Sequence, residues 1–344
     1  MNSASQAIYL SIVSIGSAGI SASRWSAVKL LDGIHKSVRA LAREVKNSHL
    51  PPRAEAPKPC RIGLALGGGF ARGLAHVGVL KALEQEGIVP DFIAGTSVGA
   101  VIGAAYCSGV SAKELEEIAS IVRFKDFARY TISRFGLCTN DRMTGFLQRI
   151  LKVKTFEELR IPLAVTATDF VTGEPIIFTK GTIIDPVRAS CAYPGVFLPV
   201  SVDGKLMVDG LLGHAVPAEP LKKMGAERVA AVFFGAHWVR KNPRHVLEVI
   251  GQCFSIAQSN MSCLWRAHAD LLIEPDVSAY GFDDFQKALG IVQVGYEAGL
   301  KVLPTFHAWA AERDSYQDYE RQTKKEKVSL APTSTIMQQP VPLG

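Results

Sequence analysis

Ser97 is the residue in this sequence whose setting most suggests chemistry. It lies at the centre of the pentapeptide Gly95-Thr-Ser-Val-Gly99, after the apolar run 90–94 and before the apolar run 100–109. A G-x-S-x-G sequence between a strand and a helix is typical of a nucleophile elbow, a tight turn that exposes a serine hydroxyl. Small residues also make tight turns without any chemistry, so the pentapeptide alone leaves both interpretations open.

A glycine cluster at residues 67–69 is a second candidate for chemistry. It follows an apolar run and precedes a helical pattern, so its backbone N–H groups can point toward one anion, either a phosphate or an oxyanion. The nucleotide-binding alternative is weakened because Phe70 stands where G-x-G-x-x-G needs a glycine, and no G-K-[ST] follows. Asp91 also precedes the second strand, whereas a dinucleotide site needs an acid at its end.

A serine hydroxyl needs a base to accept its proton, and Asp209 is the carboxylate best placed by the pattern. It ends the strand-like run 205–209, and the carboxyl ends of strands are where active-site residues of α/β sheets gather. Asp209-Gly210 could equally be an ordinary turn. A histidine-dependent hydrolase is an alternative, with His214 as its base. The histidines that follow Ser97 are His214, His237, His245, His268 and His307.

The elements that must position these residues alternate between apolar strands and helices. This alternation predicts an α/β fold, a three-layer sandwich with a mostly parallel central sheet and helices on both faces. Residues 166–178 form an antiparallel pair in this scheme, with the turn at Thr172–Gly173. The predicted strands are 61–66, 90–95, 161–170, 174–178, 205–210, 228–235 and 270–275.

Composition limits the class of protein. The 344 residues are 48% hydrophobic, which is enough for a large core. The net charge is +6, of which residues 1–60 contribute +5, from eight Lys or Arg against three Asp or Glu. The nearly neutral remainder argues against a nucleic-acid-binding domain. The six cysteines show no C-x-x-C pair or zinc spacing, so we expect a reducing compartment, no metal and no cofactor, although an even count leaves disulfides open.

Three regions follow along the chain. Residues 1–60 form a leader and a Pro-rich linker, residues 61–304 the main domain, and residues 305–344 a C-terminal helix followed by a disordered tail that starts at about 321. The segment 24–46 has the pattern of a basic amphipathic helix, which either packs on the protein's own core or contacts an anionic membrane. Residues 7–22 are too short and too rich in Ser and Gly to cross a membrane, and they make a poor signal peptide. We therefore expect a cytoplasmic protein, with peripheral membrane contact as an option.

Taken together, these motifs resemble the patatin-like phospholipases, in particular the bacterial branch related to neuropathy target esterase. The resemblance covers about residues 61–304. Its main segments are 64–88, 93–109, 166–181, 187–200 and 208–212, with 269–277 and 295–299 near the end.

The resemblance implies a lipid acyl hydrolase that works through a Ser–Asp dyad and an acyl-serine intermediate. It assigns Ser97 as the nucleophile, Asp209 as the base and the amides of Gly67, Gly68, Gly69 and Phe70 as the oxyanion hole. The supporting motif residues are Arg72, Gly73, Gly95, Gly99 and Gly210. The implied substrate is a lipid or phospholipid, and part of the apolar loop 191–200 could form an acyl-chain channel.

Two positions depart from the family pattern. Phe70 replaces a glycine, so the oxyanion hole keeps its geometry if φ at this position is negative and is distorted if a positive φ is required. Leu211 follows Asp209-Gly210 where Gly or Ala is usual. Phe70 motivates the main alternative, a binding or regulatory protein on the same fold with weak or no hydrolase activity.

Overall fold

The computed structural model describes residues 33, 35–36, 38–39, 59–131, 133–235, 242 and 246–329. The chain divides into two units, Met1–Ala56 and Pro57–Gly344. In the first unit the five described residues are helical and exposed, and the rest of the predicted helix 24–46 lies outside the described residues. Residues 330–344 of the predicted tail also lie outside them, whereas residues 321–329 are helical.

The second unit is built on a mixed sheet in which five neighbouring strands are parallel. These are β11 (Leu271–Ile273), β10 (Arg228–Val232), β1 (Ile62–Leu66), β2 (Phe92–Thr96) and β5 (Leu163–Asp169), in that spatial order. Antiparallel strands complete the sheet beyond β5, namely β6 (Pro175–Phe178), β9 (Lys205–Asp209) and β8 (Val200–Val202). The predicted mostly parallel sheet is confirmed, as is the antiparallel pair, whose turn contains Gly173 at φ 77°.

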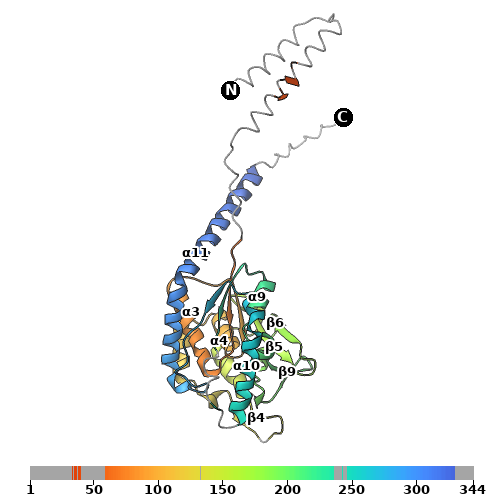
Figure 1. The fold of residues 1–344 in the computed structure, drawn as a ribbon, viewed down its shortest axis with the longest axis vertical. Helices are drawn as coiled ribbons and strands as arrows, with labels where there is room; N and C mark the ends of the chain where they lie inside the picture. The colour runs from red at the N-terminus through yellow and green to blue at the C-terminus, as the bar shows by residue number, and fades with distance from the viewer. Residues whose placement is uncertain are drawn as a thin grey trace, which may run out of the picture. The chain divides into compact units, whose positions relative to one another are not determined.

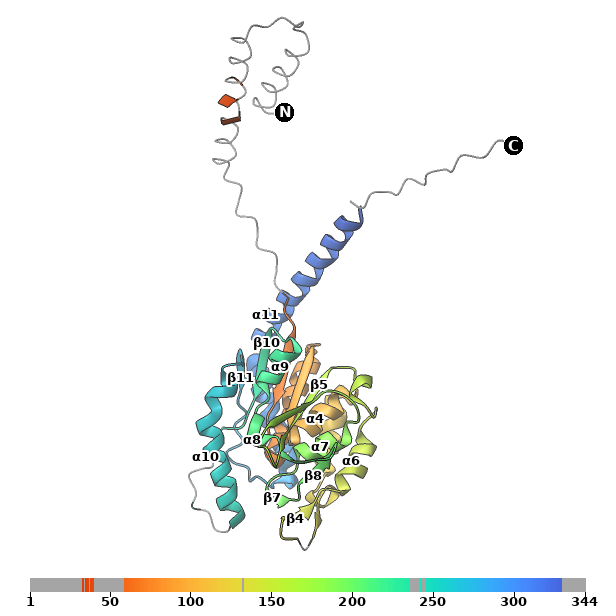
Figure 2. The same ribbon diagram turned by 90° about the vertical axis from the view of Figure 1, so that its right-hand side faces the viewer.

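Helices cover both faces of this sheet, because its central strands bury side chains on both sides (Figures 1 and 2). In β1, Ile62, Leu64 and Leu66 contribute to the larger core, while Ala65 belongs to the core on the other face. The larger core holds α3 (Ala75–Gln85), α4 (Val98–Cys107), α5 (Ala112–Ile121), α6 (Arg142–Ile150) and α11 (Ala288–Ser329). The opposite face is covered by α9 (Ala218–Met224) and α10 (Val246–Arg266).

Shorter elements complete the unit. A small sheet contains β3 (Arg129–Tyr130), β4 (Gly136–Thr139) and β7 (Gly195–Phe197). Two short helices, α7 (Ile184–Ser190) and α8 (Leu211–His214), pack against β5. The 3-10 turns are η1 (Phe70–Leu74), η2 (Phe124–Asp126), η3 (Phe156–Glu158) and η4 (Phe285–Lys287).

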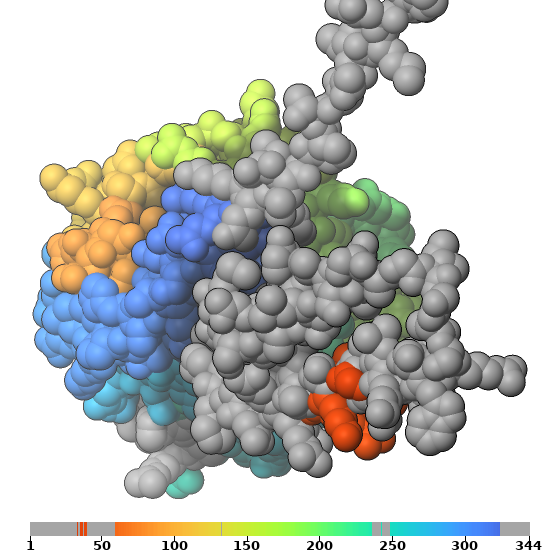
Figure 3. Space-filling view, turned by 90° about the horizontal axis from the view of Figure 1, so that it is seen from above, coloured from red at the N-terminus to blue at the C-terminus, as the bar shows by residue number. Residues whose placement is uncertain are grey.

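Helix α11 crosses the domain boundary that the sequence predicts at residue 304. It continues through Pro304, and Phe306 and Trp309 beyond it are buried in the larger core. The blue surface of α11 lies beside the orange surface of the α3 region (Figure 3). The first part of this helix, up to at least Trp309, therefore belongs to the main domain.

None of the six cysteines is in a disulfide. Cys60, Cys107, Cys138 and Cys191 are buried, and Cys253 and Cys263 on α10 are exposed. Among the residues that the structure describes, no helix combines the length and apolarity needed to cross a bilayer.

Candidate active site

Ser97 lies in a strained turn between β2 and α4. Its backbone angles are φ 55° and ψ −125°, a conformation that side-chain-bearing residues rarely adopt. Its carbonyl accepts from the amides of Ala100 and Val101, and its own amide donates to Ser190 Oγ at 2.8 Å. The turn is thus held by hydrogen bonds on both sides, as a nucleophile elbow requires.

The glycines of the pentapeptide permit this turn. A Cβ on Gly95 would overlap the carbonyl oxygen of Gly99 and the backbone of Ala100, and a Cβ on Gly99 would overlap the carbonyl of Leu66. Helix α4 can therefore begin directly against β1 and β2 only with glycine at both positions. The predicted supporting role of Gly95 and Gly99 is physically accounted for by these close approaches.

Asp209 is completely buried at the end of β9. Its Oδ1 accepts from the Leu211 amide at 2.9 Å, and Oδ2 has no hydrogen-bond partner among the described residues. Burial raises the pKa of Asp209 to about 7, opposed by the Leu211 amide and the Ser97 hydroxyl. The Ser97 hydroxyl is thus close enough to lower the pKa of the Asp209 carboxyl, yet it forms no hydrogen bond of standard length with Oδ2. A poorly paired carboxylate with a pKa near neutrality is suited to accept a proton.

Strand β5 lies between the strands that carry Ser97 and Asp209 and fixes their spacing. Thr166 Oγ1 is 2.8 Å from Thr96 Oγ1 on one side, and Thr168 Oγ1 donates to the Asp209 carbonyl on the other. A Cβ on Gly210 would overlap the Thr166 carbonyl, so the turn after Asp209 needs glycine. Leu211 supplies the amide that bonds Asp209, and this contact does not depend on its side chain.

The glycine loop presents only part of the predicted oxyanion hole. The amide of Gly67 donates to the Val232 carbonyl and that of Gly68 to the Ala215 carbonyl, both at 3.1 Å. These two N–H groups are therefore engaged in holding the loop. The amides of Gly69 and Phe70 make no hydrogen bond to any described residue, so the candidate oxyanion donors narrow to these two.

Phe70 has a positive φ of 52°, so in this chain the position takes the left-handed conformation with a phenylalanine in it. Its ring lies 5.8 to 6.5 Å from the rings of Phe124, Tyr193, Phe197 and Phe282. Aromatic packing of this kind can offset a backbone strain of about 1–3 kcal/mol. Phe70 therefore keeps the backbone turn of a glycine and adds a hydrophobic anchor.

The rest of this motif fastens the loop to its surroundings. Arg72 Nε donates to the Tyr280 carbonyl at 2.8 Å, and the Ala71 amide donates to the Phe282 carbonyl at 2.9 Å. A Cβ on Gly73 would overlap the side chain of Val98 in α4. Arg72 thus fastens the glycine loop to the Tyr280 carbonyl, and Gly73 lets the loop approach α4 closely.

Two histidines are near the site, and among the described residues neither ring forms a hydrogen bond to Ser97. The buried His76 Nε2 is 2.8 Å from the Gly67 carbonyl, and burial lowers the pKa of His76 to about 4, so the ring is neutral. His214 Nδ1 is 4.0 Å from Glu219, and burial lowers the pKa of His214 as well. The geometry favours Asp209 over His214 as the base.

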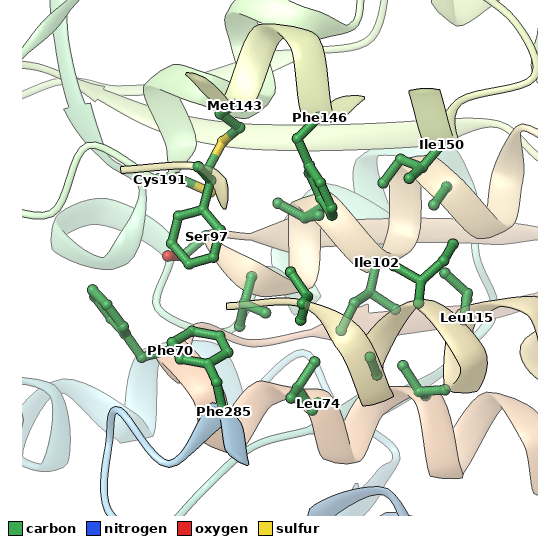
Figure 4. Close-up of a pocket in the computed structure, with 18 of the residues that line it drawn as sticks. Phe70, Leu74, Ser97, Ile102, Leu115, Met143, Phe146, Ile150, Cys191 and Phe285 are labelled. Atoms are coloured by element: carbon green, nitrogen blue, oxygen red, sulfur yellow. The ribbon is translucent and has the colours of Figure 1, made fainter. Parts of the chain in front are cut away.

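An apolar pocket with a cavity volume of about 100 Å³ opens at Ser97 (Figure 4). Ser97, Phe70 and Phe285 lie at one end and Leu115 and Ile150 at the other. Cys191 and Phe197 of the loop 191–200 are part of the lining, as are side chains of α4, α5 and α6. Burial, and then the Asp209 carboxylate, hold the pKa of Cys191 well above its usual value, so this thiol contributes as an apolar wall.

Comparison with known proteins agrees with this arrangement. Residues 64–222 match the family model described as "Patatin-like phospholipase". The chain contains a patatin-like phospholipase domain. Within it, the match covers the glycine loop, the elbow and Asp209.

The patatin-like domain also has curated relatives. An uncharacterised NTE family protein of Mycobacterium tuberculosis is 35% identical over 181 residues, 50% of this chain and 48% of that protein. Human patatin-like phospholipase domain-containing protein 6 is 28% identical over 289 residues, 72% of this chain and 20% of that protein. Lysophospholipase nte1 of Aspergillus fumigatus is 29% identical over 279 residues, 70% of this chain and 18% of that protein. The chain thus spans about half the length of the mycobacterial relative and about a fifth of the others.

Among solved structures, VipD of Legionella pneumophila is similar to this chain. The TM-score is 0.49 and the identity 15%, and the match covers 73% of this chain and 67% of that one.

Sequence reasoning did not single out Ser190, which lies in the patatin-like domain and accepts a hydrogen bond from the amide of Ser97, the candidate nucleophile. Ser190 is completely buried at the end of α7. Its only signal in the sequence was its place next to Cys191 in a segment that resembles the family. Nothing in the spacing indicates that this hydroxyl reaches a residue 93 positions earlier.

Replacing the Ser190 hydroxyl should disturb the turn at Ser97 without removing the Ser97 hydroxyl. In Ser190→Ala the Ser97 amide loses its acceptor in a buried site, which costs about 1–3 kcal/mol. We expect kcat for a soluble ester to fall about 10- to 100-fold with KM nearly unchanged. Ser108→Ala is the matched control, because it removes a buried hydroxyl from the other end of α4. Equal kcat values for the two variants would show that Ser190 has no role in positioning.

Proposed function

We propose that this protein is a serine acyl hydrolase that cleaves ester bonds of lipids or phospholipids. The observation that carries the proposal is that Ser97, in a strained elbow beside the poorly paired carboxyl of Asp209, opens on an apolar pocket. Charged substrates or sugars would gain little binding free energy from this apolar lining, whereas an acyl chain would bury its methylene groups there. The patatin-like phospholipase domain supports the same substrate class.

In the proposed mechanism Asp209 accepts the proton of Ser97 as Oγ attacks the ester carbonyl. The amides of Gly69 and Phe70 donate to the developing oxyanion, where one donor contributes about 3–4 kcal/mol to the transition state. The bond to the alcohol or lysolipid then breaks, its oxygen takes the proton from Asp209, and an acyl-serine remains. Water attacks this ester, again with Asp209 as the base, and releases the fatty acid together with a restored Ser97 hydroxyl.

Hydrolysis of p-nitrophenyl esters by matched variants tests this function. We expect Ser97→Ala to lower kcat by at least about 10³-fold, since it removes the attacking atom. His214→Ala should stay within about threefold of the wild type, because its ring faces Glu219, with Nδ1 4.0 Å from that carboxylate. A large loss in His214→Ala would favour the histidine-dependent alternative. A folded but inactive wild type would favour a binding or regulatory protein.

We also infer peripheral contact of the basic leader segment 24–46 with anionic membranes, on the strength of its sequence pattern alone. Deleting residues 1–50 should weaken binding to phosphatidylglycerol vesicles, as measured by cosedimentation. Unchanged binding would mean that this segment packs elsewhere. The proposal is consistent with a cytoplasmic, peripherally attached enzyme.

A further inference from the structure

Exposed apolar side chains gather on the hairpin formed by β3 and β4. Tyr130 is 81% exposed, Phe135 64% and Leu137 47%. A short hairpin with three large apolar side chains in water is unusual for a protein surface, where such residues tend to be scattered singly. This surface is therefore a candidate for contact with an apolar partner.

The hairpin lies directly outside the Ser97 end of the pocket. Strand β4 pairs with β7, where Cys138 is opposite Phe197, and the Phe197 side chain lines the pocket. Phe282 is also 47% exposed, and its ring is 5.9 Å from the ring of Phe70, another pocket residue. The exposed residues thus belong to elements that pack directly against residues lining the pocket.

The first turn of α10 extends this surface. Since β10 and β11 are parallel neighbours joined through α10, the helix runs back against the strands and begins at their carboxyl edge. Figures 1 and 2 both show the start of α10 at the same end of the unit as β4. Val249, in the first turn, is 44% exposed. We call Tyr130, Phe135, Leu137, Val249 and Phe282 the apolar rim.

The charge around the hairpin indicates which kind of apolar partner fits. Residues 123–142 contain five Lys or Arg and two Asp, a net charge of +3. The Arg134 guanidinium lies over the Phe135 ring, 4.8 Å from its centroid. The acids are engaged locally, because Asp126 accepts from the Arg123 amide and Asp141 pairs with Arg129 and Arg188. Aromatic side chains mixed with basic ones are typical of surfaces that bind anionic lipid.

We propose that the apolar rim docks on an anionic lipid bilayer and so places the Ser97 end of the pocket against the membrane. The proposal rests on the proposed function for the identity of the substrate, which the bilayer holds. Aromatic and aliphatic side chains of the rim enter the headgroup region, while the surrounding Arg and Lys side chains contact lipid phosphates. None of the five rim residues belongs to the leader segment 24–46.

Partition of the full-length chain into vesicles of mixed phosphatidylglycerol and phosphatidylcholine tests the rim. Phe135→Ser combined with Leu137→Ser should weaken partition about tenfold or more, because each side chain loses most of its apolar transfer free energy. Val89→Ser combined with Tyr319→Ser is the matched control, since both residues are exposed, at 47% and 41%, and lie outside the rim. Equal partition of both double variants with the wild type would overturn the proposal.

The two exposed cysteines of α10 provide a local measurement that binding through the leader would not produce. At 1.5 Å per residue, Cys253 lies about 10 Å along α10 from its start and Cys263 about 26 Å. Docking through the rim should slow labelling of Cys253 by a water-soluble maleimide about fivefold or more and slow Cys263 much less. Equal labelling rates with and without vesicles would contradict the proposal. So would protection that appears without vesicles and grows with protein concentration, which would indicate a second copy of the chain.

These measurements remain informative whether or not the protein hydrolyses esters. Vesicle binding and Cys253 protection need no turnover and can be repeated in Ser97→Ala. Docking without hydrolysis would reject the proposed function and support membrane docking through the rim. Hydrolysis of soluble esters without docking would support the proposed function and reject docking through the rim.

Discussion

Replacing Asp209 by Asn should abolish turnover and at the same time stabilise the folded protein at alkaline pH. The amide cannot accept the Ser97 proton, so we expect kcat to fall by at least about 10³-fold. Its carbonyl oxygen can still accept from the Leu211 amide, which keeps the local geometry. Steady-state hydrolysis of a soluble ester measures the loss.

The gain in stability follows from the pKa of Asp209. This pKa is about 7 in the folded protein against 3.8 ordinarily, so the folded state binds the proton more tightly than the unfolded chain. The cost of the buried charge is absent below pH 3.8, grows as the pH rises, and is fully present above pH 7. Each pKa unit corresponds to about 1.4 kcal/mol, so at pH 8 the Asn variant should be more stable by roughly 4 kcal/mol.

Thermal unfolding at two pH values separates this effect from a merely structural one. The melting temperature of Asp209→Asn should exceed that of the wild type by about 5 °C or more at pH 8, and the difference should nearly vanish at pH 4. In the wild type, kcat/KM should fall about tenfold per pH unit below pH 7, as the base becomes protonated. A less stable Asn variant at pH 8 would mean that Asp209 is a structural carboxylate with partners of its own.

The second large effect concerns the length of the acyl chain. Leu115 lies at the end of the pocket opposite Ser97 (Figure 4). Leu115→Trp should shorten the pocket and lower kcat/KM for long-chain p-nitrophenyl esters by about 30-fold or more, since each excluded methylene forfeits about 0.8 kcal/mol. The butyrate ester, which occupies only the Ser97 end, should be cleaved within about threefold of the wild-type rate.

The butyrate rate also reports whether the variant is folded. Leu115→Met keeps the side-chain volume and serves as the control, with the wild-type preference retained. Parallel losses on short and long esters in a folded Leu115→Trp protein would show that the acyl chain lies outside this pocket.

Features that depend on neighbouring residues in the chain could be predicted from the sequence. The order of strands and helices, the elbow around Ser97 and the strand that ends in Asp209 all follow from apolar runs and glycine spacing within one short segment. These features agree with the sheet topology of the structure.

Contacts between distant segments could not be predicted in the same way. Ser190 on α7 accepts from the Ser97 amide, and the amides of Gly67 and Gly68 donate to the carbonyls of Val232 and Ala215. Such pairings depend on where α7, β10 and the residue after α8 lie in the folded domain, which no local pattern encodes. The sequence also placed the end of the main domain at residue 304, before Phe306 and Trp309. Both side chains pack in a core built mainly from residues far earlier in the chain, and a local pattern does not show this.

The central claim is that Ser97 is a nucleophile activated by Asp209, and covalent trapping by a long-chain alkyl fluorophosphonate tests it most directly. Mass spectrometry of the digested wild type should locate the phosphonate on Ser97, with no adduct in Ser97→Ala and labelling slowed by at least about 10²-fold in Asp209→Asn. An unlabelled wild type that is folded, or labelling at full rate in Asp209→Asn, would contradict the account.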